Sequence, residues 1–158
     1  MDLEYPFPRM VAVLSAAGKT VAFAESCTGG LAGHMITKEP GASAYFLGSA
    51  VVYSNQSKTS VLGVPAATVE EHGAVSEETA LAMAKGARRV YGSDIGASIT
   101  GIAGPGGGTD EKPVGLVCIA ATDGESSVVS SNRFPGDRED VRGASVQMMA
   151  EHVLRILG

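Results

Sequence analysis

The sequence predicts a three-layer α/β/α sandwich with a mixed, mainly parallel sheet and a late β-hairpin. Its 158 residues are 44% hydrophobic, which is enough for one packed domain. Helical and strand-like segments alternate first, and this order is typical of helices that cover both faces of a sheet. Two strand-like runs around a short turn then precede a last helical segment. We therefore treat residues 1–158 as a single domain.

The first half of the chain predicts alternating helices and strands. Apolar residues recur at helical spacing up to Ala17, and Gly18 suits the end of that helix. Pro40 and Gly41 end the next helix, and Gly48 predicts a bulge in the strand that follows. The predicted elements are a helix over 7–17, a strand over 20–24, a helix over 31–39, a strand over 44–54 and a short helix or turn ending at 63.

The second half begins with the clearest helix of the sequence and ends with a hairpin and a helix. Ser76 precedes two glutamates, a pattern that suits the positive first turn of a helix. The segment "DGES" (123–126) predicts a hairpin turn between two β-rich runs. The predicted elements are a helix over 76–92, a strand over 94–102, hairpin strands over 115–122 and 126–134, and a helix that begins at Asp137.

Composition excludes several classes of protein. A net charge of −5 argues against a general nucleic-acid-binding surface. Cys27 and Cys118 form no zinc or CxxC pattern, so we expect reduced thiols. The first residues lack the order of a signal peptide, and no apolar run reaches the ~18 residues of a membrane span. We therefore expect a cytoplasmic protein without a membrane partner.

The stretch "AESCTGG" (24–30) places hydroxyl and thiol groups where a strand ends and a helix begins. The first N–H groups of a helix are unpaired and positive, so Ser26 or Thr28 can serve simply as a helix cap. Gly29 and Gly30 would also let a ligand approach the backbone closely. A Ser26 nucleophile would have N–H donors beside it for an oxyanion. A helix cap and a catalytic turn both stay open here.

Cys27 is the rival nucleophile in that stretch. A helix N-terminus lowers the pKa of a thiol, which favours reactivity. A cysteine nucleophile usually needs a histidine partner, and the sequence around His34, His72 and His152 supplies none. We interpret Cys27 as a small buried residue, and the histidines as surface or core residues rather than a triad or a metal site.

The stretch "VVYSNQSK" (51–58) puts Tyr53 at the end of a strand and Lys58 shortly after it. Such a tyrosine usually lies in the core, and such a lysine is usually solvated. The carboxyl ends of parallel strands are, however, where α/β proteins bind ligands. A lysine becomes a base for serine only if its pKa falls from about 10.4 towards 7. The protein must then destabilise the charged form relative to the neutral form by roughly 4 kcal/mol.

Two further stretches suggest an anion site. "TGIAGPGGGTDEKPVG" (100–115) begins at a strand end with Thr100 and is rich in glycine, including Gly101 and Gly104. It does not have the spacing of a P-loop, so a flexible surface loop is an equal interpretation. Arg138, in "GDRE", is either an ordinary surface charge or a bidentate partner for a phosphate.

Together these stretches resemble a known family. "AESCTGG", "YSNQSK", "GAVS", "TGIAGPGGG", "KPVG" and "GDRE" follow one another here in the same order as in the C-terminal domain of CinA, the competence/damage-inducible protein family. That domain also occurs alone, as a nicotinamide mononucleotide (NMN) deamidase of the PncC-like type. The resemblance runs from about residue 5 to the C-terminus, and the order of several motifs makes it specific.

The resemblance implies an amidohydrolase that converts NMN to nicotinic acid mononucleotide and ammonia, without a cofactor or a metal. It implies that Ser26 is the nucleophile and that Lys58 and Tyr53 act as base or as orienting and proton-relay groups. Self-association into a homo-oligomer is also implied, while no nucleic-acid partner is expected. The residues expected to bind the pyridine mononucleotide are Cys27, Thr28, Gly29, Gly30, Thr100, Gly101, Gly104 and Arg138.

Two other interpretations stay open. A non-catalytic nucleotide-binding module with a regulatory role would keep the pocket without the chemistry. A structural or assembly role would make the polar residues caps and interface contacts. The combination of Ser26, Tyr53 and Lys58 favours an amidohydrolase, because a module that only binds needs no nucleophile.

Overall fold

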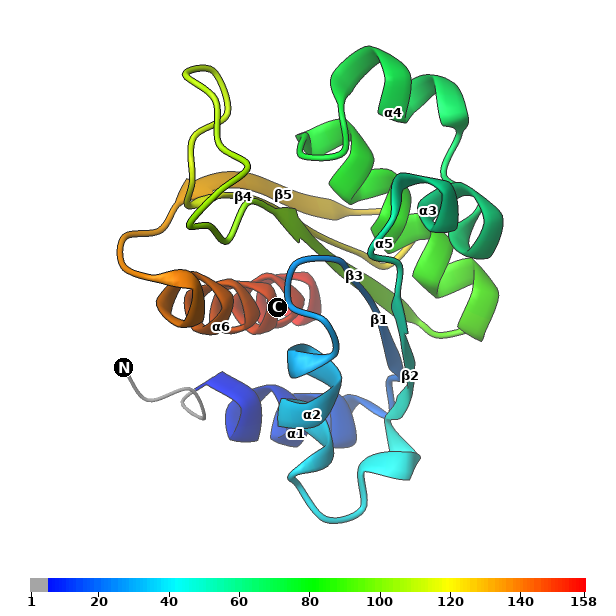
Figure 1. The fold of residues 1–158 in the computed structure, drawn as a ribbon. Coiled ribbons are helices and arrows are strands. Elements are labelled where there is room, and N and C mark those ends of the chain that lie inside the picture. Colours follow the sequence, from blue (N-terminus) through cyan, green and yellow to red (C-terminus); the bar gives the residue numbers. More distant parts are fainter. Residues whose placement is uncertain (1–5) are drawn as a thin grey trace.

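The structure, a computed structural model, describes residues 6–158 and has one sheet between two layers of helices (Figure 1). Residues 1–5, which the predicted domain includes, lie outside the described part. The elements are α1 (Pro6–Ala17), β1 (Val21–Glu25), α2 (Leu31–Thr37), the 3-10 helix η1 (Ala42–Ala44), β2 (Phe46–Val51), α3 (Asn55–Leu62), α4 (Ala66–His72), α5 (Glu77–Tyr91), β3 (Ile95–Gly101), β4 (Leu116–Thr122), β5 (Ser127–Arg133) and α6 (Arg138–Leu157).

The sheet has five strands in the order β2-β1-β3-β4-β5. Strand β1 pairs in parallel with both β2 and β3, whereas β3 with β4 and β4 with β5 pair antiparallel. Four of the strands therefore share one direction, and β4 opposes them. This arrangement confirms the predicted α/β fold with a mixed sheet and a late hairpin, whose strands β4 and β5 flank residues 123–126.

The two faces of the sheet carry side chains of different size. Helices α1, α2 and α6 cover the face with large apolar residues such as Phe23, Ile99 and Ile119. Helices α3 and α5 cover the other face (Figure 1), whose inward residues are Ala22, Ala24, Ala50, Gly96, Ser98 and Ala120. At Gly96 an added Cβ would overlap the backbone of α5, so small residues allow α5 to pack closely.

Most of the predicted elements are present with small changes in their limits. Ser76 caps α5, as its sequence context predicts, and Asp137 caps α6, which begins at Arg138 rather than at Asp137. The predicted bulge is confirmed, because the register between β1 and β2 shifts next to Gly48. The predicted strand over 44–54 is shorter, since pairing with β1 begins only at Phe46. The sequence analysis did not predict α4, a two-turn helix without a buried residue.

The fold brings the chemistry-bearing stretches to one edge of the sheet. Strands β1, β2, β3 and β5 run in the same direction, so their carboxyl ends lie at one edge. The segments that follow them are residues 26–30, 52–54, 102–115 and 134–137. Every stretch that we singled out therefore begins at this edge, where α/β proteins bind ligands. Among residues 6–158, no helix combines the length and apolar character that a membrane span requires.

Candidate active site

A cavity of about 270 Å³ opens at this edge of the sheet. Most of the predicted site residues line it, together with Asn55, Ala74 and Val75, which sequence reasoning missed. Thr28, Gly29 and Gly30 are not among the lining residues, so their role in binding stays a prediction. The predicted residues that line the cavity are Ser26, Cys27, Tyr53, Lys58, Thr100, Gly101, Gly104 and Arg138.

Ser26 and Lys58 form a buried pair at the floor of this cavity. Lys58 comes from α3, 32 positions after Ser26, and its Nζ donates a hydrogen bond to Ser26 Oγ at 3.1 Å. The Lys58 residue is 1% exposed and Ser26 is 8% exposed. Nucleophile and base within hydrogen-bond reach are the basic requirement for activating a serine.

Burial shifts the Lys58 ammonium group towards its neutral form, whereas its two carbonyl acceptors suit the charged form. Burial lowers the pKa of its ammonium group from the usual 10.5, and the nearby Cys27 partly opposes this shift. Two carbonyl oxygens hold the group in place: Nζ donates to Val52 O at 3.0 Å and to Tyr53 O at 3.3 Å. A neutral amine fixed beside a hydroxyl can accept its proton.

Cys27 lacks the features of a reactive thiol. It is buried, and burial raises the pKa of its thiol to about 11, although Arg142 and Arg138 pull it in the opposite direction. A thiol with this pKa is protonated at neutral pH and is a poor nucleophile. Residues 6–158 contain no group of three His, Cys, Asp or Glu side chains arranged to hold a metal ion.

Glu25, the last residue of β1, fixes the turn that follows this strand by accepting hydrogen bonds within the protein interior. We call residues 26–30 the nucleophile turn. The Glu25 carboxylate is fully buried and accepts hydrogen bonds from Thr28 Oγ1 at 2.7 Å, from the Ala32 and Gly33 N–H groups, and from Ser49 Oγ at 2.6 Å. Glu25 therefore takes the role of the helix cap that we considered for Ser26 and Thr28, which leaves the Ser26 hydroxyl to Lys58.

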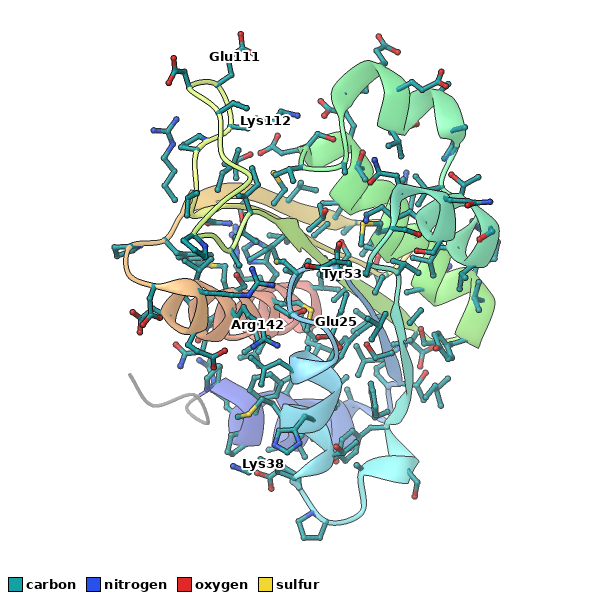
Figure 2. The ribbon with its side chains drawn as sticks, in the orientation of Figure 1. Glu25, Lys38, Tyr53, Glu111, Lys112 and Arg142 are labelled. Carbon is teal, nitrogen blue, oxygen red and sulfur yellow. The ribbon has the colours of Figure 1, made fainter. Side chains whose placement is uncertain are left out.

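Arg142 holds the same turn from the side of α6. Its Nε donates to the Cys27 carbonyl at 3.2 Å, and its Nη2 donates to the Thr28 carbonyl at 2.9 Å. Figure 2 shows Arg142 reaching from α6 to the region between β1 and α2 where Glu25 also lies. Sequence reasoning missed Glu25 and Arg142. A charged residue at the end of an apolar strand, and an arginine one helical turn after Arg138, were the available signals.

Tyr53 and Arg138 lie at the mouth of the cavity. Tyr53 is 63% exposed, and Arg138 Nη2 contacts its hydroxyl at 3.5 Å. Arg138 Nη1 donates to the Gly104 carbonyl at 2.7 Å, which ties the start of α6 to the loop after β3. The Tyr53 carbonyl, and not its hydroxyl, contacts Lys58.

Another part of the cavity wall comes from the end of β3 and the segment after it. We call residues 102–115 the glycine-rich loop. Thr100 is buried, and its hydroxyl donates to the Ala74 carbonyl at 2.8 Å, so it fixes the segment before α5 against β3. Residues 105–111 of the glycine-rich loop are exposed, and Lys112 Nζ donates to the His72 carbonyl at 2.7 Å.

The fold and the buried pair define an α/β protein with a serine and a lysine at the carboxyl edge of its sheet. The family model of the CinA C-terminal domain matches residues 7–157. A CinA-like protein of Mycobacterium sp. (strain JLS) is 52% identical over 140 residues, and one of Citrifermentans bemidjiense is 53% identical over 141 residues. These matches cover 88% and 89% of this chain, but only 33% and 34% of the relatives. The chain thus spans about a third of the length of these curated relatives.

Solved structures give the same result. The competence/damage inducible protein CihA from Agrobacterium tumefaciens superposes with a TM-score of 0.95 at 37% identity, covering 99% of this chain and 96% of that one. A CinA superfamily protein from Klebsiella pneumoniae superposes with a TM-score of 0.94 at 32% identity, covering 99% and 98%. The chain belongs to the CinA C-terminal domain family.

Proposed function

We propose that this domain is an amidohydrolase that converts the carboxamide of NMN to the acid and ammonia. The observation that carries the proposal is the 3.1 Å hydrogen bond between Lys58 Nζ and Ser26 Oγ in a buried site that opens into a cavity. The curated relatives are longer than this chain, so the proposal concerns the activity of this domain.

In the first half of the reaction, neutral Lys58 takes the proton of Ser26 as Oγ attacks the carboxamide carbon. Backbone N–H groups of the nucleophile turn stabilise the negative oxygen of the tetrahedral intermediate. When this intermediate collapses, the C–N bond breaks and Lys58 returns the proton to the leaving nitrogen. Ammonia departs, and the acid group remains as an ester on Ser26.

In the second half, water hydrolyses that ester. Lys58 takes a proton from the water as its oxygen attacks the ester carbon, and the C–O bond to Ser26 then breaks. The proton returns to Ser26 Oγ, which regenerates the starting pair and releases the carboxylic acid. No cofactor takes part in either half of this scheme.

Binding of the nucleotide is assigned to the mouth of the cavity. Arg138 carries a positive charge there and can pair with a phosphate. Because the Tyr53 hydroxyl lies beside Arg138 rather than beside Ser26, we assign Tyr53 to orienting the substrate. Thr100, Gly101 and Gly104 form a further part of the cavity wall and limit the space for the substrate. Contacts to the nucleotide hold the carboxamide close to Ser26.

One observation favours a second candidate, a nucleotide-binding module without catalysis. Lys58 Nζ also donates to the carbonyls of Val52 and Tyr53, and these acceptors suit a charged ammonium that serves as a structural brace. In that case Ser26 would only be a further acceptor for the brace. NMN would then bind at the cavity without turnover.

The experiment that separates these candidates measures ammonia and acid release from NMN by the purified protein. We expect turnover by the wild type, its loss in Ser26→Ala, and its retention in Cys27→Ala, the matched control at the next position. Loss of activity in Cys27→Ala with retention in Ser26→Ala would reject Ser26 as the nucleophile. Tight NMN binding without any turnover by the wild type would support the binding module.

We further propose that the domain acts in the cytoplasm as a homo-oligomer. Cys27 and Cys118 are both free and buried, which suits a reducing compartment. The mass in solution, measured by light scattering, tests self-association, and a monomer at all concentrations would reject it.

A further inference from the structure

Arg142 touches the nucleophile turn although the scheme above gives it no role. Its Nε and Nη2 donate to two consecutive carbonyl groups, those of Cys27 and Thr28. Its third nitrogen, Nη1, contacts Glu139 Oε1 on the same helix at 2.8 Å. The guanidinium thus fixes the backbone that immediately follows Ser26, from a helix more than a hundred positions away in the chain.

The direction of a carbonyl group determines where the next N–H group points. In a trans peptide the C=O and the following N–H point in opposite directions. The Cys27–Thr28 peptide is trans, so the Thr28 N–H points away from Arg142. The preceding peptide is fixed within the turn, because the Ser26 carbonyl accepts a hydrogen bond from the Gly29 N–H at 3.1 Å. The Cys27 N–H therefore points away from Gly29.

Neither the Cys27 nor the Thr28 N–H group donates to a backbone acceptor within residues 6–158, whereas the N–H groups of Ser26, Gly29 and Leu31 do. Successive backbone N–H groups in a turn form a concave site for an anion. Ser26 and Cys27 both line the cavity, whereas Thr28 is fully buried, so the Cys27 N–H is the donor of this turn that an oxyanion in the cavity can reach.

We propose that Arg142 is a positioning residue: by holding the two carbonyl groups that follow Ser26, it keeps the Cys27 N–H aimed at the oxygen of the reacting carbonyl group. This inference rests on the proposed Ser26 chemistry. Donors held in place before the reaction stabilise the developing charge without reorganisation. By this assignment the nucleophile turn supplies Ser26 and the donor beside it, and Arg142 of α6 keeps that donor in place.

The test compares wild type with Arg142→Gln and Arg142→Lys. A lysine can hold one carbonyl but cannot span two, so its effect should be intermediate. Arg155→Gln is the matched control, because it removes the same charge from the exposed last turn of the same helix. Melting temperatures identify any variant that does not fold, and if Arg142→Gln fails then Arg142→Lys carries the comparison.

Two measurements are made on each variant. The first is turnover of NMN and of its analogue in which sulfur replaces the carboxamide oxygen. The second is the rate at which an alkyl fluorophosphonate labels Ser26. In that labelling Ser26 Oγ bonds to phosphorus, the P–F bond breaks, fluoride leaves and the serine proton passes to Lys58. The phosphoryl oxygen uses the same donor, and the labelling does not depend on NMN being the substrate.

We expect Arg142→Gln to lower kcat and the labelling rate by about 10- to 100-fold, with little change in KM, because an oxyanion donor is misplaced. The preference for the oxygen substrate over the sulfur substrate should shrink, which a purely structural loss would not produce. Labelling within about twofold of wild type, or an unchanged oxygen-to-sulfur ratio despite a lower kcat, would overturn the inference.

The labelling also separates this inference from the proposed function. If wild type is labelled at Ser26 but does not hydrolyse NMN, the proposed substrate is wrong, and the labelling rate of Arg142→Gln alone decides the role of Arg142. If wild type is neither labelled nor active, Ser26 is not a nucleophile and the inference falls with it.

Discussion

The nucleophile turn and the glycine-rich loop meet at one cavity but are built in opposite ways. Buried charged and polar groups hold the turn: Glu25 contacts it from the inside, and Arg142 contacts it from α6. Residues 105–111 of the loop are exposed, and the side chains that tie the loop to neighbouring elements are Lys112 and Arg138. Glycine makes up a similar share of both segments, two residues of the turn and five of the longer loop, so glycine content does not explain the difference.

The contrast between the turn and the loop indicates which part of the candidate site requires fixed geometry. The turn carries Ser26, the proposed nucleophile, and a nucleophile must be held within a fraction of an ångström of its reactive position. In the proposed function, the loop forms the outer wall that a substrate passes. We therefore expect changes in the turn and its partners to affect kcat and stability, and changes in the loop to affect KM.

The largest effect is expected for Lys58→Met, which keeps a long side chain but removes the base. We expect kcat to fall by about 10³-fold or more, because general-base catalysis typically contributes 10²–10⁴-fold. Ammonia release at saturating NMN measures this loss. Lys85→Met, on the exposed side of α5, is the control and should keep full activity. A Lys58→Met enzyme with more than a tenth of wild-type kcat would show that Lys58 is not the base.

The pH dependence of kcat is the next largest effect. Burial lowers the pKa of Lys58, so its neutral form appears at lower pH than for an ordinary lysine. We expect kcat to rise about tenfold per pH unit below this pKa and to level off above it, at a pH below 10.5. A profile that falls with rising pH, or that levels off only above 10.5, would contradict this role.

Removal of the Glu25 carboxylate tests whether the rigid turn depends on it. Glu25→Ala leaves the Thr28 hydroxyl, the Ser49 hydroxyl and two backbone N–H groups without their buried acceptor. We expect a loss of roughly 3 kcal/mol in the free energy of unfolding and about a tenfold lower kcat. Urea unfolding measures the first. Glu25→Gln should lose less, and Glu125→Ala, in the exposed hairpin turn, should lose almost nothing.

The smallest effect is expected in the glycine-rich loop. Lys112→Ala removes the contact between the loop and the His72 carbonyl. Because this contact is partly exposed and lies away from Ser26, we expect KM to rise by about two- to threefold with kcat unchanged. Steady-state kinetics with NMN check this outcome. A fall in kcat equal to that of Glu25→Ala would show that the loop and the turn do not differ in the way proposed.

Sequence reasoning predicted most of the fold because its signals are local. The caps at Ser76 and Asp137, the hairpin turn at 123–126 and the bulge at Gly48 each depend on a few neighbouring residues, and the structure has all of them. The short helix α4 was missed because no buried residue marks its sequence. The limits of the second predicted strand were wrong because pairing with β1, and not local propensity, decides where it begins.

Sequence reasoning named several of the residues that line the cavity but not their arrangement. The motifs named Ser26, Lys58 and Arg138, and all three line the cavity. They did not show that Tyr53 contacts Lys58 only through its carbonyl, or that Thr100 uses its hydroxyl to hold the Ala74 carbonyl. These roles depend on which groups the fold places within hydrogen-bond distance.

The sequence alone thus determined the alternation of elements and the motifs that follow the strands, because periodicity and capping are properties of short segments. Only the tertiary structure decided what holds Ser26 in place. Glu25 of β1 accepts a hydrogen bond from Ser49 of the neighbouring strand β2, and Arg142 donates to Cys27, which lies 115 positions earlier in the chain. Pairs this distant leave no spacing in the sequence, since the pairing of β1 with β2 creates the first and the packing of α6 creates the second. Glu25, and neither Ser26 nor Thr28, caps helix α2, and this leaves Ser26 free to pair with Lys58.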